Sequence, residues 1–277
     1  MSEPMVAREA NELQDEVRLL RAVNQQLTLS ALESQRREFT ATAAYRQQSA
    51  FLVTAAHELR NPLLPIRLAA HMMTRASNDE TALAALQATI TAQVADMSRL
   101  INDLLDGSRV STGKFRLERT VVEIGSLIHL ALQTCAPAIE ERKHRLSVAL
   151  PEAPIKVLGD RLRLMQVFDN LINNAAKYTL PGGQIAIDVS VEGAEVAVTI
   201  TDNGTGIGRE ALPHIFELYV QDAHAEGVAP GGLGIGLAVV RELVEAHEGS
   251  VVAFSDPERG GSEFVVRLPL ATIALVA

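Results

Sequence analysis

Four stretches of the sequence carry side chains that could do chemistry. In the first, over residues 51–63, His57 stands beside an acid, Glu58, and five residues before Pro62. A neighbouring carboxylate can orient one imidazole nitrogen and raise the nucleophilicity of the other. A single His on a helix is more often structural or exposed, so this stretch alone indicates only a candidate nucleophile.

The second stretch lies in a helix expected over 160–178. Asn170, Asn174 and Lys177 are spaced by four and three residues, which places them on one helical face. Amide oxygens are hard ligands that suit Mg²⁺, and a lysine beside them suits phosphate. Asn pairs on helices are mostly surface residues, so this pattern is weak by itself.

The third and fourth stretches are glycine clusters. DNGTGIG begins at Asp202, directly after an expected strand, and GGLGIGL over 231–237 directly precedes an expected helix. Glycines let a backbone approach a ligand closely, and amides at a helix N-terminus favour an anion. The spacing is not that of a Walker P-loop. A Rossmann site is not indicated either, because the sequence lacks a strand–GxGxxG–helix unit with an acid about twenty residues further on.

The segment that precedes these stretches predicts a long polar helix. Residues 9–47 contain no Gly or Pro, and leucines recur every seven residues. An Asn at a heptad core position typically selects a parallel dimer. A dimeric coiled coil or a single solvated helix both fit. The heptad core positions are Leu13, Val17, Leu20, Asn24, Leu27 and Ala31.

A helical hairpin must position His57. An amphipathic helix is expected over 48–76, interrupted at Pro62 and Pro65, and a second one follows the turn chemistry of residues 77–80. Each helix has one apolar stripe, so two hairpins are expected to pair as a four-helix dimer. The break GSRVSTG over 107–113 is the expected hinge to the next domain.

An α/β layer domain with much antiparallel strand order is expected beyond that hinge. Its expected helices cover 123–142, 160–178 and 234–247, and its expected strands cover 115–119, 144–150, 184–191, 194–202, 251–255 and 263–268.

Composition excludes several classes of protein. The chain has 277 residues and a net charge of −9, which argues against a nucleic-acid surface. No apolar run reaches the roughly 18 residues of a membrane span. The single cysteine, Cys135, excludes an internal disulfide and is typical of a reducing compartment, so a cytoplasmic location is expected.

In this order, the four stretches resemble the H, N, G1 and G2 boxes of sensor histidine kinases, and residues 215–219 (IFELY) resemble the F box. The resemblance covers about residues 48–270. It implies an α plus α/β fold in three parts. These are a coiled coil over 1–47, a dimerisation and phosphotransfer hairpin over 48–111, and an ATP-binding domain of the Bergerat (GHKL) type, an α/β sandwich, over 112–277.

The resemblance also implies an activity, ATP-dependent phosphorylation of the protein's own histidine. His57 would accept the γ-phosphoryl group, Glu58 would activate it, and the phosphoryl group would pass to an Asp of a response regulator. Asn61 occupies a position linked in this family to phosphatase activity toward that regulator. The implied partners are a second copy of the chain, a separate receiver domain and an upstream sensor protein.

The remaining boxes would bind ATP and Mg²⁺. Asn174 resembles the metal ligand and Asn170 would support it, Lys177 would contact phosphate, and Tyr178 would pack on the nucleotide. Asp202 would accept a hydrogen bond from the adenine amino group. The glycine boxes would shape the base and phosphate sites through Gly204, Gly206, Ile207, Gly232, Leu233, Gly234, Gly236 and Leu237.

One departure keeps alternatives open. Residues 210–231, within the expected lid over 208–233, contain no Lys or Arg, although many family members carry one there, and His224 would be a weak substitute. Asn170, in contrast, stands where the related gyrase and chaperone ATPases have a water-activating Glu, and the absence of that Glu argues against simple ATP hydrolysis. The alternatives are an ATPase or serine kinase of the same superfamily, and a non-catalytic scaffold or a phosphatase only.

Overall fold

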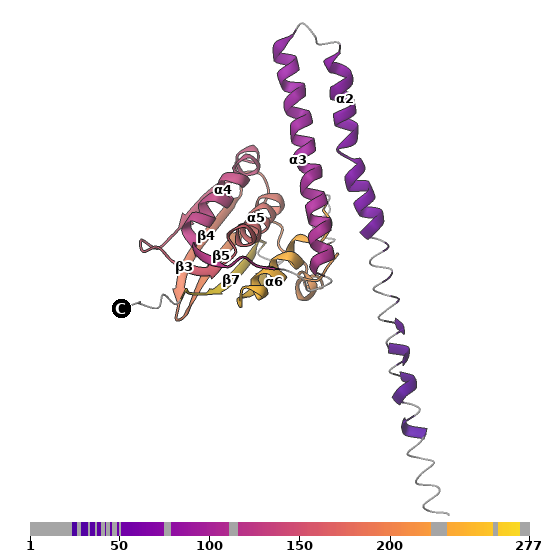
Figure 1. Cartoon of the computed structure of the whole chain (residues 1–277), viewed down its shortest axis with the longest axis vertical. Helices are drawn as coiled ribbons and strands as arrows, with labels where there is room; N and C mark the ends of the chain where they lie inside the picture. Colours follow the sequence, from indigo (N-terminus) through magenta and orange to yellow (C-terminus); the bar gives the residue numbers. More distant parts are fainter. Residues whose placement is uncertain are drawn as a thin grey trace, which may run out of the picture. The chain divides into compact units, whose positions relative to one another are not determined.

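The structure is a computed structural model, and its two units, Met1–Val53 and Thr54–Ala277, are described separately (Figure 1). The described residues are 24–26, 29–32, 34–36, 38–39, 42, 45, 49, 51–74, 79–110, 116–222, 232–256 and 260–271.

In the N-terminal unit, the described residues between 24 and 45 are helical and exposed, as the polar composition predicts. Asn24 and Ala31 of the heptad pattern are among them. Leu13, Val17, Leu20 and Leu27 lie outside the described residues, so the coiled coil stays a prediction.

Pro62 interrupts the first helical segment of the hairpin. Residues 54–60 are helical, a turn follows at 61–62, and α2 runs over Leu63–Met73. The Asn61 N–H still donates to the His57 carbonyl at 3.0 Å, which closes the segment before the turn. Pro65 lies in the first turn of α2, where its missing N–H leaves no helical bond unmade. The predicted interruption is therefore confirmed at Pro62 and wrong at Pro65.

Helix α3 (Glu80–Val110) packs antiparallel to α2, which confirms the hairpin (Figure 1). The expected break at 107 begins too early, because α3 continues to Val110. Gly107 is buried there, and a Cβ on it would stand 3.1 Å from Ile235 Cδ1. The Asp106 carboxylate also accepts from Gln166 Nε2 at 2.6 Å, so tertiary contacts hold the last turns of α3. Residues 111–115 lie outside the described part of the chain.

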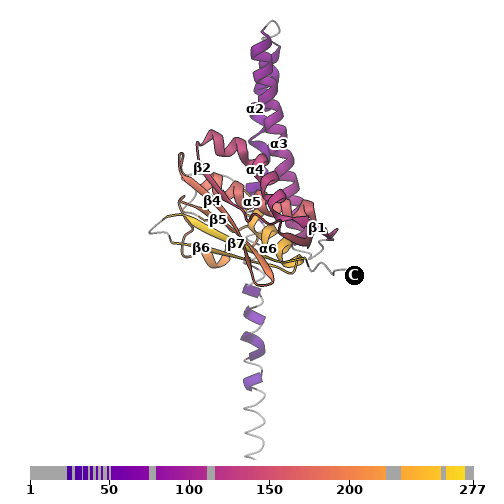
Figure 2. The same cartoon turned by 90° about the vertical axis from the view of Figure 1, so that its left-hand side faces the viewer.

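A five-stranded sheet forms the base of the following domain, in the order β2-β4-β5-β7-β6. Strand β2 is parallel to β4 and the other neighbours are antiparallel. Figure 2 shows the helices on one face of this sheet. The elements are β1 (Thr120–Glu123), α4 (Ile124–Glu141), β2 (Arg145–Ala149), β3 (Lys156–Gly159), α5 (Arg161–Tyr178), β4 (Gln184–Glu192), β5 (Glu195–Asp202), η1 (Leu212–His214), α6 (Gly236–Ala246), β6 (Ser250–Ser255) and β7 (Ser262–Pro269).

The expected α/β architecture is confirmed, with two corrections. The strand expected over 115–119 is wrong, since the described residues 116–119 are not in a ladder and β1 begins at Thr120. The Glu118 N–H instead donates to Asp160 Oδ2 at 3.0 Å. Strand β3 was not expected, because its pairing with β1 comes from a segment more than thirty residues away.

Helix α5 has one face in the core and an opposite, polar face that carries candidate site residues. Asp160 is its N-cap, because its Oδ1 accepts from the N–H groups of Leu162 and Arg163. The apolar face is fully buried and fixes the rotation of the helix, so the opposite face points away from the core. The buried side chains of α5 include Leu164, Val167, Phe168, Leu171 and Ile172.

No helix in the described ranges combines the length and the apolar character that crossing a membrane requires.

Candidate functional site

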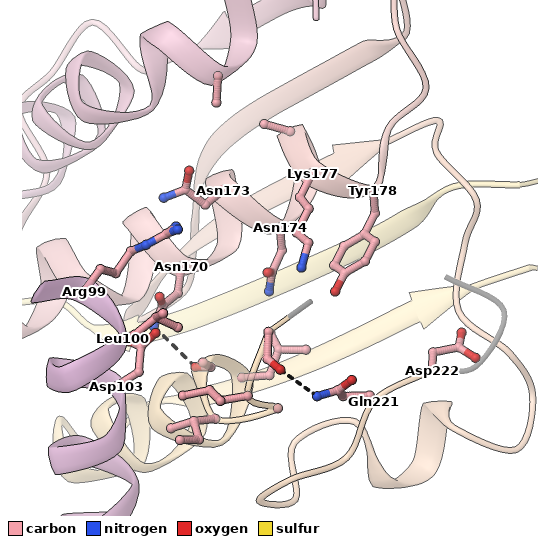
Figure 3. A pocket seen from close by; sticks show the side chains of 18 of the residues that line it. Arg99, Leu100, Asp103, Asn170, Asn173, Asn174, Lys177, Tyr178, Gln221 and Asp222 are labelled. Carbon is pink, nitrogen blue, oxygen red and sulfur yellow. Dashed lines mark hydrogen bonds between the residues drawn. The ribbon is translucent and has the colours of Figure 1, made fainter. Parts of the chain in front are cut away.

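A cavity of about 610 Å³ lies beside α5 and the start of α6 (Figure 3). Its volume is in the range of sites that hold a small-molecule ligand. It brings together most of the nucleotide-site residues expected from the sequence. Those that line it are Asn170, Asn174, Lys177, Tyr178, Asp202, Gly206, Ile207, Gly232, Leu233, Gly234, Gly236 and Leu237.

Asn174, Lys177 and Tyr178 point into this cavity from the last turns of α5 (Figure 3). Asn170, one turn earlier, donates from Nδ2 to the Gly236 carbonyl at 3.3 Å. That bond ties α5 to the first residue of α6 and directs the two helices at the same space. The predicted common face of α5 is therefore confirmed as a geometric arrangement.

Burial shifts the pKa values of Lys177 and Tyr178, the two residues at the end of α5. It lowers the pKa of Lys177, an effect that Arg99 and Arg142 add to and Glu58 opposes. Its Nζ lies 3.4 Å from the position that a Cβ on Gly232 would take, so the ammonium group stands beside the second glycine cluster. Burial also raises the pKa of the Tyr178 hydroxyl, and Asp222 adds to this rise.

Asp202 is buried where β5 ends, and both of its carboxylate oxygens accept hydrogen bonds. Oδ1 accepts from the Gly204 N–H at 2.8 Å, and Oδ2 accepts from the Ser262 hydroxyl. Burial raises the pKa of Asp202, and these hydrogen bonds oppose the rise. The donors fix the carboxylate at the wall of the cavity, where its remaining lone pairs can accept from a ligand.

Glycine is required at two positions of the site for different reasons. A Cβ on Gly204 would stand 2.4 Å from the Tyr178 carbonyl oxygen, so only glycine lets the loop after β5 pass the end of α5. Gly204 itself does not line the cavity, so its contribution is to the path of this loop. Gly234 has a φ of +64°, which side chains rarely adopt, and a Cβ there would also meet Tyr219.

The donor set at α5 fits a magnesium ion that arrives with a nucleotide. Mg²⁺ usually takes one or two protein oxygens together with phosphate oxygens and water. An amide oxygen of Asn174 beside the Lys177 ammonium group offers such a partial set (Figure 3). Asn170 would support it through the bond to Gly236, which leaves its own amide oxygen available.

The described part of the expected lid contributes two residues that the sequence did not single out. Gln221 donates from Nε2 to the Gly232 carbonyl at 2.8 Å, and Asp222 accepts from the Gly208 N–H at 2.6 Å. Both follow the IFELY stretch, and that position was the available signal for them. His224 lies outside the described residues.

Other contributors come from distant segments and left no sequence signal. Ser262 belongs to β7, and Arg142 ends α4. Arg142 Nη1 donates to the Lys177 carbonyl at 2.8 Å and so supports the C-terminal end of α5. Arg99 and Asp103 of α3 also line the cavity (Figure 3).

The hairpin residues are placed unevenly. Glu58 and Asn61 line the cavity, whereas His57 is exposed and is not one of the lining residues.

The interpretation of the other histidines as structural or exposed is confirmed for those described. His71, His129 and His214 are exposed, and His144 and His247 are buried with hydrogen-bonded rings. Cys135 is buried, as expected of a small apolar residue, and burial raises its pKa to about 12.

Two family profiles match the chain in the order of these features. Residues 47–113 match the "His Kinase A (phospho-acceptor) domain". Residues 159–272 match the "Histidine kinase-, DNA gyrase B-, and HSP90-like ATPase" family. The first match contains His57, and the second contains both glycine clusters and the polar face of α5.

The chain is similar in sequence and in fold to known proteins, among them sensor histidine kinases. The chain is 34% identical to the probable sensor histidine kinase TcrY of Mycobacterium tuberculosis, over 77% of this chain and 44% of that protein. The full-length ShkA structure in complex with AMPPNP is 26% identical, with a TM-score of 0.59 over 82% of this chain and 46% of that one.

A complex of the histidine kinase ThkA with the response regulator protein TrrA has the same fold. Its TM-score is 0.54 at 23% identity, over 82% of this chain and 64% of that one. Of the curated relative TcrY, the chain spans less than half of the length. The order of the two domains, the boxes and these relatives agree, and the chain belongs to the sensor histidine kinase family.

Proposed function

We propose that the protein transfers the γ-phosphoryl group of ATP to its own His57 and then to an Asp of a response regulator. The observation that carries the proposal is the cavity at the end of α5. It combines buried Asp202, the amides of the glycine clusters and the Asn174–Lys177 face, and it is lined by Glu58, the neighbour of His57.

Each wall of the cavity has a proposed role. Asp202 accepts from the adenine amino group, and Tyr178 packs against the nucleotide. Lys177 and the amides near Gly232 and Gly236 contact phosphate oxygens. When Mg²⁺ is bound through Asn174, with Asn170 in support, it neutralises charge on the phosphates.

The transfer itself needs little from the protein beyond position and charge. A nitrogen of the His57 imidazole forms a bond to the γ-phosphorus as the bond to the bridging oxygen breaks, and ADP leaves with that electron pair. Glu58 accepts a hydrogen bond from the other ring nitrogen and stabilises the positive charge that develops on the ring. Asn170 supplies no general base for water, which favours transfer to His57 over hydrolysis.

The proposed partners follow from the hairpin. Its exposed apolar side chains, such as Leu64 at 60% and Leu68 at 57% exposure, suit a second hairpin packed against them as a dimer. The receiver domain of a response regulator would take the phosphoryl group from exposed His57. ThkA, which shares the fold, is a histidine kinase solved in complex with such a regulator.

Asn61 favours a second activity, dephosphorylation of the partner regulator. It is exposed one helical turn after His57, and its backbone N–H donates to the His57 carbonyl. An amide at that place can orient a water molecule toward an aspartyl phosphate that docks on His57. Replacing Asn61 by Ala should then slow loss of phosphate from the regulator while leaving phosphorylation of His57 intact.

The test is incubation of the full chain with radiolabelled ATP and Mg²⁺, followed by mapping of the labelled residue. We expect label that is stable in base and labile in acid, as phosphohistidine is. His57→Gln should abolish it. His71→Gln, which alters another exposed histidine of the hairpin, should retain it.

Other outcomes identify the alternatives. Label that survives His57→Gln contradicts the proposed acceptor, and acid-stable label would indicate a serine kinase. Release of inorganic phosphate without label would indicate an ATPase. A wild type that fails to bind nucleotide would indicate a scaffold. Asn174→Ala should remove the Mg²⁺ dependence of nucleotide binding.

A further inference from the structure

The nucleotide cavity has an uneven supply of positive charge. Among the described residues that line it, the Arg and Lys side chains are Arg99, Arg142 and Lys177. Arg142 donates from Nη1 to the carbonyls of Lys177 and Thr179 at 2.8 and 3.4 Å, so its guanidinium group is bound to the backbone at the C-terminal end of α5. Lys177 stands beside Gly232. Residues 210–231, which form most of the expected lid, contain no Lys or Arg.

Arg99 reaches the cavity from a different part of the chain. It lies in α3, the second helix of the hairpin, and extends toward the polar face of α5 near Asn173 (Figure 3). Its charge contributes to the lowered pKa of Lys177, which places the two cations within electrostatic range of each other. The hairpin and α5 thus each present a cation to one space.

The contacts that Arg99 makes are weak enough to exchange. Its Nη2 lies 3.2 Å from Asp96 Oδ1, and the two side chains are 61% and 52% exposed. Exposed pairs of this kind contribute little, because water screens them and both side chains lose freedom. Asp103, one turn further along α3, is another nearby acid. Burial raises its pKa to about 6, and the charge of Arg99 opposes that rise. A phosphate group with several acceptor oxygens binds a guanidinium group more strongly than one exposed carboxylate does.

We propose that Arg99 binds the terminal phosphate of ATP and supplies, from the hairpin, the cation that residues 210–231 of the lid lack. The inference rests on the proposed ATP-dependent function. Its consequence is that the site is complete only while α3 lines it, next to the hairpin segment that carries His57. Charge stabilisation of the transferring phosphoryl group is then tied to the presence of its acceptor.

A binding experiment tests the contact without any reaction. The affinities of the full chain for AMPPNP and for ADP, both with Mg²⁺, are measured by titration calorimetry. Arg99→Gln should weaken AMPPNP binding by about tenfold, because it removes a charged hydrogen-bond donor, and should change ADP binding by less than about twofold. Asp96→Asn, which removes the same ion pair but keeps the guanidinium group, should preserve both affinities. An unchanged ratio of AMPPNP to ADP affinity in Arg99→Gln would overturn the inference.

A rate measurement separates this inference from the proposed function. At saturating ATP, Arg99→Gln should label His57 about 10- to 100-fold more slowly than wild type, and Arg99→Lys should recover part of the rate. Wild-type rates in Arg99→Gln would overturn the inference while the kinase function stands. A wild type that never labels His57 would overturn the kinase function, and the nucleotide affinities would still decide whether Arg99 contacts the terminal phosphate.

Discussion

The hairpin and the ATP-binding domain differ in how they bury apolar side chains. Among the described residues of the hairpin, the buried apolar side chains are the small Ala55, Pro62 and Ala69, whereas Leu63, Leu68 and Ile101 are 46–57% exposed. In the ATP-binding domain, Phe168, Leu171 and Val198 have no exposed surface at all. One region completes its core within a single copy of the chain, and the other exposes an apolar surface that a second copy can cover.

This difference suits the two tasks that we propose. A rigid core must hold Asp202, Asn174 and the glycine clusters in place, because phosphoryl transfer depends on position. The hairpin must expose His57 to two different partners, the ATP site and a regulator. Its stability is therefore expected to come from pairing, and its dependence on protein concentration should reveal that.

The largest effect should follow from breaking the self-contained core. Phe168→Ala removes a fully buried ring from α5 and should lower the free energy of unfolding by about 3–5 kcal/mol. Urea denaturation followed by circular dichroism measures this. Leu162→Ala, at a 72% exposed position of the same helix, should cost less than about 0.5 kcal/mol. Equal losses in the two variants would contradict the described burial of α5.

Charging the exposed surface of the hairpin should affect association instead. Leu68→Glu places a carboxylate on the proposed dimer interface, and loss of one buried Leu should raise the dissociation constant by about 10- to 100-fold. Sedimentation at several concentrations measures it. Leu180→Glu, which alters a 54% exposed leucine after α5, is the control and should leave association unchanged. A dimer that tolerates Leu68→Glu must use another surface.

Breaking the contact between the end of α3 and the ATP-binding domain should have an intermediate effect on stability. Buried Asp106 accepts from Arg109, Arg163 and Gln166 at 3.1, 3.4 and 2.6 Å, so Asp106→Ala removes three hydrogen bonds to a buried carboxylate and should cost about 1–3 kcal/mol. Hydrogen exchange should quicken in the last turns of α3. Asp96→Ala breaks only an exposed pair of the same helix and should cost less than about 1 kcal/mol. Similar exchange in both variants would show that the contact does not hold the junction.

The smallest effect should come from a buried histidine, and it depends on pH. His247 Nε2 accepts from the Asp160 N–H at 2.9 Å, and Nδ1 donates to the Leu243 carbonyl, so the ring is neutral. Burial lowers its pKa in the folded state below the ordinary 6.5. As pH falls below 6.5, the unfolded chain takes up this proton first, so the stability that neutral His247 provides is lost.

His247→Gln measures that contribution. Wild type should exceed this variant by about 1 kcal/mol above pH 7, since two hydrogen bonds of a buried ring are altered. The difference should shrink as the pH is lowered from 6.5 toward 5. His129→Gln, at an exposed histidine of α4, should show no comparable slope. A difference that grows on acidification would mean that His247 is charged in the folded protein.

Much of the site could be predicted because its parts are local patterns. The spacing of Asn170, Asn174 and Lys177 along one helix requires only the helical period to place them together. The buried strands β4 and β5 alternate or run apolar, and the glycine turn after β5 follows directly from the loop sequence. These signals need no knowledge of which segments meet.

Other features depend on contacts that no local pattern encodes. Gly107 continues α3 instead of ending it, and it packs beside Ile235, which lies more than a hundred residues away. The Ser262 hydroxyl reaches Asp202 only because β7 pairs with β5 in one register. No motif in the sequence includes Arg99, and it lines the cavity only because α3 packs beside the next domain.

The sequence by itself determined which residue types the site offers and how they are spaced, since residue type and spacing along single helices and turns are local properties. The folded arrangement decided which side chains share the nucleotide cavity and where the hairpin ends. Those outcomes follow from burial and from hydrogen bonds between distant segments, whose free energies exist only after the chain has brought the partners together.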